Sequence, residues 1–121
     1  MKTVTQRIRD HLLLNAGVIE KNKIPDLNIL RKTEWSPRFE RLMRDGLLLG
    51  AFRYGLLNAL SKKQFNRMKD IRYRSKLYEQ TGNTEYLVDM ANMCLLEFEE
   101  GLHPNKHFRR TDDGYHTEEK R

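Results

Sequence analysis

Hydrophobic residues recur at helical spacing in four stretches of this chain, at about residues 4–20, 39–60, 62–80 and 85–100. Polar and turn-forming residues separate these stretches, and the three prolines fall between them, where no helical hydrogen bond is lost. The pattern predicts an all-α fold, a small bundle of about four helices. The last two helices are expected to form an antiparallel C-terminal hairpin, followed by a polar tail.

The second helical stretch has the clearest start signal and the widest apolar surface. Ser36 can cap the first free amides of a helix, and Pro37 suits the first helical position. Apolar residues cover more than one face of this stretch, up to Leu56, Leu57 and Leu60, which favours it as the central helix. Gly46, Gly50 and Gly55 lie inside it, although each interior glycine costs about 1 kcal/mol relative to alanine. We expect them either to admit the close approach of another helix or a ligand, or to mark a break near Gly50.

Residues 21–35 connect the first two helical stretches. This run mixes turn-forming residues with isolated isoleucine and leucine, so it lacks a sustained helical period. We expect an ordered connector, with a short helical turn as an option, that directs Ile29, Leu30 and Trp35 inward.

The last two helices carry opposite charges. Residues 61–82 hold seven basic residues against Asp70 and Glu79, whereas residues 83–102 hold five acidic residues and no Lys or Arg. Gly82 suits the end of one helix, and Asn83 or Thr84 can cap the next. A tight turn lays the two helices side by side, so we expect their charges to neutralise each other. The sides expected to face the core are Phe65, Met68, Ile71, Ser75 and Tyr78 on the first helix and Leu87, Met90, Ala91, Cys94, Leu95 and Phe98 on the second.

Composition places the chain among small basic proteins. It has 121 residues, a net charge of +6, 38% hydrophobic residues and 33% charged residues. We expect a helical bundle domain at residues 1–102, a partly ordered tail at 103–121, and a core thin enough for a homo-oligomer or partner to add burial. Neither a transmembrane stretch nor a signal peptide is visible, and Cys94 is the single cysteine. These features predict a cytoplasmic protein with no membrane partner.

Arginines and aromatic residues on the second helix are candidates for a phosphorylated ligand. Arg41, Arg44 and Arg53 could contact phosphate groups, because guanidinium groups bind phosphate oxygens bidentately. Phe52 and Tyr54 flank Arg53 and could stack on a base. The alternative is a solvated face with intrahelical pairs such as Arg41–Asp45 and Glu40–Arg44.

Polar residues on the last helix are a second candidate. Asp89 and Asn92 are three residues apart among apolar neighbours, so each needs a partner. They could line a pocket for a nucleobase, or Asp89 could bind a divalent metal together with Glu85. The alternative is an interhelical network from Asp89 to Arg72 or Tyr73. The complete expected ligand-binding set is Arg41, Arg44, Phe52, Arg53, Tyr54, Arg72, Asp89 and Asn92.

The remaining residues give no convincing catalytic or metal site. His103, His107 and His116 have a composition that could bind zinc, but a third ligand at fixed spacing is missing, and a turn in which the histidines cap carbonyls is the favoured interpretation. No serine or cysteine stands in a nucleophile signature, and no phosphate-binding glycine motif occurs. We therefore expect no catalytic residue, no metal and no cofactor.

Two stretches carry a resemblance, G-A-F-R-Y-G at 50–55 and T-G-N-T-E-Y-L-V-D-M-A-N-M-C-L-L-E-F-E-E-G-L-H-P-N-K-H-F at 81–108. Together they resemble small all-α proteins of phages and mobile elements. The pattern L-V-D-x-A-N is also similar to the metal-binding last helix of the MazG-like nucleotide pyrophosphohydrolase superfamily. That resemblance implies an acidic pair at Glu85 and Asp89, here spaced E-x-x-x-D where the superfamily has E-x-x-D.

These observations predict a homo-oligomeric helical protein that binds a phosphorylated, nucleotide-like small molecule. The resemblance implies a purpose, which is to sequester a nucleotide second messenger of host defence in the host cytoplasm. Three alternatives stay open. One is a nucleic-acid-binding inhibitor module, the second is a host-protein-binding interaction protein, and the third is a MazG-like magnesium-dependent hydrolase.

Overall fold

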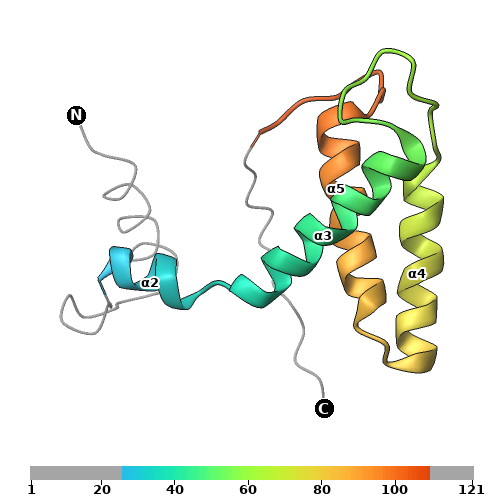
Figure 1. Cartoon of the computed structure of the whole chain (residues 1–121). Helices are drawn as coiled ribbons and strands as arrows, with labels where there is room; N and C mark the ends of the chain where they lie inside the picture. The colour runs from blue at the N-terminus through green and yellow to red at the C-terminus, as the bar shows by residue number, and fades with distance from the viewer. Residues whose placement is uncertain (1–25, 110–121) are drawn as a thin grey trace, which may run out of the picture. The chain divides into compact units, whose positions relative to one another are not determined.

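The computed structural model of the chain describes residues 26–109 (Figure 1). Regular structure in that range is helical, with α2 at Leu27–Thr33, α3 at Pro37–Tyr54, α4 at Arg67–Thr81 and α5 at Glu85–Glu100. The predicted all-α class is therefore confirmed. The helix expected at about residues 4–20 and the end of the tail lie outside the described residues. The chain divides between Leu42 and Met43 into two units, which are described separately.

The first unit contains the short helix α2. Asp26 caps it, because its side chain accepts a hydrogen bond from the Asn28 amide at 2.7 Å. The helical option for the connector is thus confirmed. Ile29 and Trp35 are 56% and 59% exposed, so their expected inward packing is wrong, and Leu30 is half-buried. Within this unit α2 has about two turns and offers these side chains little surface to pack against.

Helix α3 begins where the sequence predicts. Pro37 is its first residue, and Ser36 Oγ accepts a hydrogen bond from the Phe39 amide at 3.0 Å. No residue of α3 is fully buried, so its expected role as the central helix is wrong. Its apolar residues are spread around the helix, and one helix neighbour cannot cover them all.

Helix α3 ends at Tyr54 rather than near Gly50. Gly55 follows with a φ of +107°, a conformation that residues with a Cβ rarely adopt. The chain then turns into a loop, residues 55–66, that leads to α4. The apolar residues assigned to the end of the helix lie in this loop, and all three are exposed: Leu56, Leu57 and Leu60.

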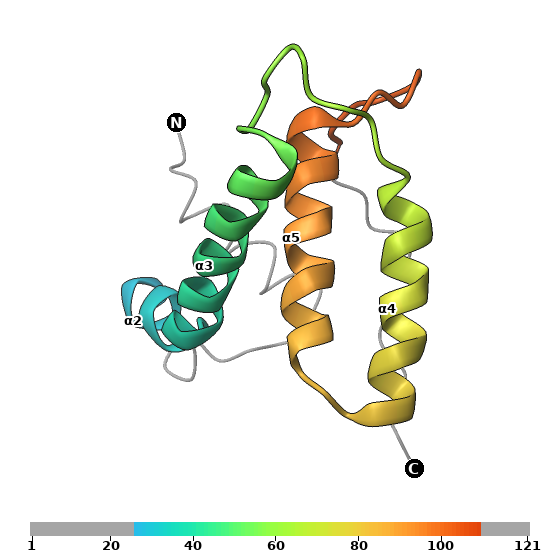
Figure 2. The same ribbon diagram turned by 45° about the vertical axis from the view of Figure 1, so that its right-hand side comes forward.

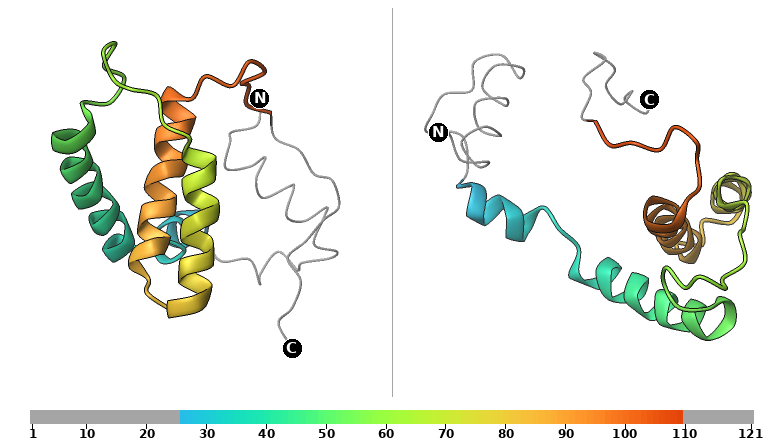
Figure 3. Two further views of the ribbon diagram at one scale, coloured as in Figure 1. Left: turned by 90° about the vertical axis from the view of Figure 1, so that its right-hand side faces the viewer. Right: turned by 90° about the horizontal axis from the view of Figure 1, so that it is seen from above.

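Helices α4 and α5 form the predicted antiparallel hairpin. Gly82 ends α4 with a φ of +71°, and the Asn83 side chain accepts a hydrogen bond from the Glu85 amide at 3.1 Å. Helix α4 starts at Arg67, later than expected, after Asn66 caps it. In the second unit, α5 lies between α4 and the C-terminal part of α3, so α5 is the central helix (Figure 2 and Figure 3).

The second unit has a thin apolar core. Among the described residues of the chain, Val88, at 9% exposed, is the one buried apolar residue, whereas Arg67 and Asn92 are buried polar residues. Several expected core residues are instead exposed because three helices leave the far side of each helix uncovered. They are Phe65, Met68, Cys94 and Phe98. Ile71, Ser75 and Tyr78 on α4 are half-buried, as are Leu87, Met90, Ala91 and Leu95 on α5.

Gly46 is the glycine that admits the close approach of another helix. A Cβ on Gly46 would lie 2.7 Å from Asn92 Nδ2 on α5, whereas a Cβ on Gly50 would meet only the ring of its own neighbour Tyr54, at 4.0 Å. Asn92 Nδ2 donates a hydrogen bond to the Met43 carbonyl at 3.1 Å. The glycine thus allows α3 and α5 to be joined by this bond.

Replacing each of these two glycines by alanine should change stability in opposite directions. Alanine gains about 1 kcal/mol of helix propensity at either position. At Gly46 it also displaces the Asn92 amide, and a lost buried hydrogen bond costs about 1–3 kcal/mol. We expect Gly46→Ala to be less stable than Gly50→Ala by about 2 kcal/mol in urea denaturation. Equal stabilities would show that Asn92 moves aside without cost.

Candidate functional site

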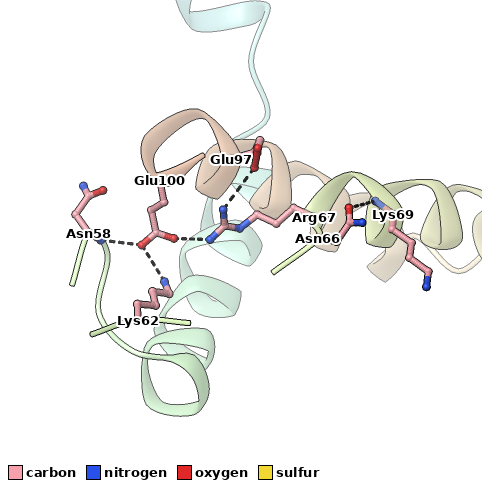
Figure 4. A network of polar contacts seen from close by, with 7 residues as sticks. All are labelled: Asn58, Lys62, Asn66, Arg67, Lys69, Glu97 and Glu100. Atoms are coloured by element: carbon pink, nitrogen blue, oxygen red, sulfur yellow. Dashed lines mark hydrogen bonds and ion pairs between the residues drawn. The ribbon is translucent and has the colours of Figure 1, made fainter. Parts of the chain in front are cut away.

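An ionic clasp fixes the loop that follows α3 to the C-terminal end of α5 (Figure 4). Arg67 Nη2 lies 2.7 Å from Glu100 Oε1, and Lys62 Nζ lies 3.1 Å from Glu100 Oε2. The Asn58 amide donates to the same Oε2 at 2.8 Å, and Arg67 Nη1 lies 3.5 Å from Glu97. The clasp joins the loop, α4 and α5 through one carboxylate.

The clasp is buried and its central carboxylate is ionised. The side chains of Arg67 and Glu100 are 5% and 7% exposed. Burial by itself raises the pKa of Glu100, but the Asn58 amide bond, the Lys62 bond and the positive charges of Lys62 and Arg67 outweigh it. The pKa of Glu100 is therefore held below its ordinary value.

A basic hollow of about 450 Å³ lies between the end of α3 and the clasped loop. Its volume suits a small organic ligand. Three cations and two aromatic rings line it, and no carboxylate does. The Tyr54 and Phe65 rings meet edge to face, with centroids 5.5 Å apart. The lining residues are Arg53, Tyr54, Gly55, Ala59, Ser61, Lys62, Lys63 and Phe65.

The two exposed cations of the basic hollow can attract an anion. Lys62 is already bonded to Glu100, so its charge is balanced within the clasp. Arg53 and Lys63 are exposed and, within residues 26–109, form no ion pair. Ser61 adds a hydroxyl that can donate to a phosphate oxygen. The basic hollow therefore presents anion donors beside aromatic surface.

A second hollow of about 310 Å³ shares part of the same loop but has mixed charge. Glu99 and Glu100 line it together with Lys62, Lys63 and Arg67. Carboxylates repel phosphate groups, so the basic hollow is the better anion site.

The structure brings together only part of the arginine and aromatic set predicted on α3. Arg53 and Tyr54 line the basic hollow. Phe52 is the neighbouring residue and is 91% exposed. Arg41 lies in the first unit, and Arg44 is engaged in an interaction of its own; neither lines the basic hollow. The alternative Arg41–Asp45 pair is wrong, because these two side chains form no ion pair in the described part of the chain.

The polar pair on α5 serves the helix packing. Asp89 Oδ2 lies 3.5 Å from Arg74 Nε across the hairpin, which confirms the expected interhelical pairing of basic and acidic helices. Its partner is Arg74 rather than Arg72 or Tyr73, because Arg74 is on the side of α4 that faces α5. Arg72 is exposed and lines neither hollow.

Asn92 is buried against α3 and also lines neither hollow. Its amide nitrogen bonds the Met43 carbonyl, and its Oδ1 is buried with no partner among the described residues. The structure therefore places Asn92 in the packing between α3 and α5 and outside both hollows. The prediction that each polar group on this face is paired holds for Asn92 Nδ2 but not for Asn92 Oδ1.

His103 and His107 form a local turn in the described part of the tail. His103 Nδ1 accepts a hydrogen bond from the Asn105 amide at 3.0 Å, and His107 Nδ1 lies 2.8 Å from the Asn105 carbonyl. Within residues 26–109, no group of three or more metal-ligating side chains converges. His116 lies outside this range.

Sequence reasoning missed Lys63, Ser61 and Phe65 as site residues. Lys63 and Phe65 fall at the start of the third predicted helix, and Ser61 directly precedes it. Lysines at a helix surface need no function. The signal that could have separated them is Asn66, a strong N-cap residue, because α4 begins directly after it at Arg67, five residues later than expected.

Comparison with protein-family models, with curated proteins and with solved structures finds no match to this chain. In the described range, no helix is both long and apolar enough to cross a membrane.

Proposed function

We propose that this protein binds a phosphorylated, nucleotide-like small molecule in the basic hollow. Arg53 and Lys63 contact the phosphate groups, and the Tyr54–Phe65 pair or the exposed Phe52 ring stacks on the base. The observation that carries the proposal is the meeting of exposed cations and aromatic rings in one hollow without a carboxylate.

Binding without hydrolysis is the form of this activity that the contacts favour. The MazG-like alternative needs Asp89 as a metal ligand beside Glu85. Asp89 is instead paired with Arg74, and Glu85 is exposed in the first turn of α5. We therefore propose sequestration of the ligand. The resemblance to small phage proteins supports a nucleotide messenger of host defence as its target.

Replacing both exposed cations of the basic hollow should abolish ligand binding. Calorimetric titration of the wild-type protein with a panel of nucleoside triphosphates and cyclic oligonucleotides is expected to give heat with at least one of them. We expect Arg53→Ala/Lys63→Ala to weaken that binding by at least about 100-fold, since each charge-assisted bond contributes about 1.5–3 kcal/mol. The matched control is Arg72→Ala/Lys76→Ala, which removes two exposed cations of α4 and should leave binding unchanged.

Salt dependence separates this function from nucleic-acid binding. A pocket that holds one ligand should lose affinity gently with added salt, whereas a nucleic-acid interface with many phosphate contacts loses it steeply. A wild-type protein that gives no heat with the panel but binds DNA or RNA with a steep salt dependence would replace the proposal. Release of pyrophosphate from a triphosphate would favour the hydrolase.

A further inference from the structure

The outer face of α3 in the second unit carries large apolar side chains that the described chain leaves uncovered. Leu48, Leu49 and Phe52 are 63%, 57% and 91% exposed. At helical spacing Leu48 and Phe52 lie on the side of α3 away from Gly46, which faces α5, and Leu49 lies on the flank between that side and Gly46. Burying apolar surface is worth about 25 cal/mol per Å², so an open patch of this kind marks an interaction surface.

Two charged residues frame this patch at equal distances. Asp45 precedes Leu49 by four residues and Arg53 follows it by four, so each is one turn, or about 6 Å, from Leu49 along the helix. Both side chains are exposed. They are too far apart on α3 to pair with each other, and neither forms an ion pair with another described residue.

We propose that a second copy of this chain covers the outer face of α3, with the two α3 helices antiparallel and the twofold axis at Leu49. This arrangement places Asp45 of each copy opposite Arg53 of the other, and Phe52 of each copy beside the other copy's Leu48. A parallel arrangement would place like charges together. The patch is thus self-complementary in charge in one direction only, which is the property of an isologous interface.

The dimer covers Phe52, so it is compatible with a ligand in the basic hollow that stacks on the Tyr54–Phe65 pair, and it does not depend on that ligand. Arg53 has five N–H donors, so one edge of its guanidinium group can bind the carboxylate while another faces an anion. Three large apolar residues per copy make a small interface, so we expect a dissociation constant in roughly the micromolar range.

Charge reversal tests the pairing directly, with the full chain and no ligand. Sedimentation velocity over a concentration series should show a dimer for the wild type. D45R and R53D should each weaken it by at least about tenfold, since each places two like-charge contacts in the interface. The double variant D45R/R53D inverts both pairs and should return to within about threefold of the wild type. E79R and K76E, which make the same charge changes on the outer side of α4, should leave the dimer intact.

A crosslink at the twofold axis gives an independent readout. Leu49→Cys in a Cys94→Ser background should form a disulfide-linked dimer under mild oxidation, whereas Lys76→Cys in the same background should not. A monomeric wild type at about 100 µM would overturn the proposal. So would a dimer that the single reversals leave unchanged, a double variant as weak as the singles, or a Leu49→Cys protein that does not crosslink.

Discussion

Replacing Arg67 by alanine is expected to destabilise the protein by about 3–5 kcal/mol. Its side chain is 5% exposed and Nη2 bonds Glu100 at 2.7 Å, so alanine would leave a buried carboxylate without its closest partner. The free energy of unfolding of a domain of this size is only about 5–15 kcal/mol, so the substitution removes a large share of the stability. The variant should show a much lower urea midpoint by far-ultraviolet circular dichroism at pH 7.

The matched control for Arg67→Ala is Arg72→Ala on the same helix. Arg72 is exposed and forms no ion pair with any residue in the described range, so its removal should cost less than about 0.5 kcal/mol. A loss below about 1 kcal/mol for Arg67→Ala would show that the clasp is not a main source of stability. Arg67→Lys should keep only part of the lost stability, because lysine has no second nitrogen to reach Glu97 as Arg67 Nη1 does.

The sequence predicts the helical hairpin well because its signals are local. Gly82 in the left-handed conformation, the Asn83 side chain beside it and the change from basic to acidic charge all act within a few residues. The predicted bounds of the last helix match those of α5. Start signals of this kind also placed Pro37 correctly at the beginning of α3.

The sequence could not predict which polar residues are buried. Seven basic residues lie between positions 61 and 82, and periodicity does not single out Arg67 among them. Its burial depends on Glu100, which lies 33 residues away and meets it only after the hairpin closes. The same holds for Asn92, whose partner is a backbone carbonyl on α3.

The candidate site was predicted in part for a related reason. The sequence predicts Arg53 and Tyr54 because an arginine and aromatic residues are adjacent in the run F-R-Y-G at 52–55. Lys63 and Phe65 reach the same hollow only because Gly55 ends α3 and the clasp holds the loop back against it. The clasp is therefore needed for the proposed function as well as for the fold. Its loss should release the loop and move Lys63 and Phe65 away from the basic hollow.

Glu100 should make the protein sensitive to acid, in a direction set by its lowered pKa. A carboxylate whose pKa is lower in the folded than in the unfolded state contributes stability that is fully present above the unfolded value, about 4.3, and is lost as the pH falls through the folded value. The wild type should therefore lose stability below about pH 4.5. Glu100→Gln removes the charge at every pH while keeping the shape of the side chain.

We expect Glu100→Gln to cost about 3 kcal/mol at pH 7, because Lys62 and Arg67 then keep their positive charges without the carboxylate between them. The difference between wild type and variant should shrink as the pH falls from 5 toward 3, since the wild-type carboxyl group becomes neutral as well. Urea denaturation at pH 7, 5, 4 and 3 measures both proteins, with Glu99→Gln on the exposed side of α5 as the control. A gap between wild type and Glu100→Gln that stays constant across this range would mean that the ionisation of Glu100 does not stabilise the fold, and that the clasp acts through hydrogen bonds alone.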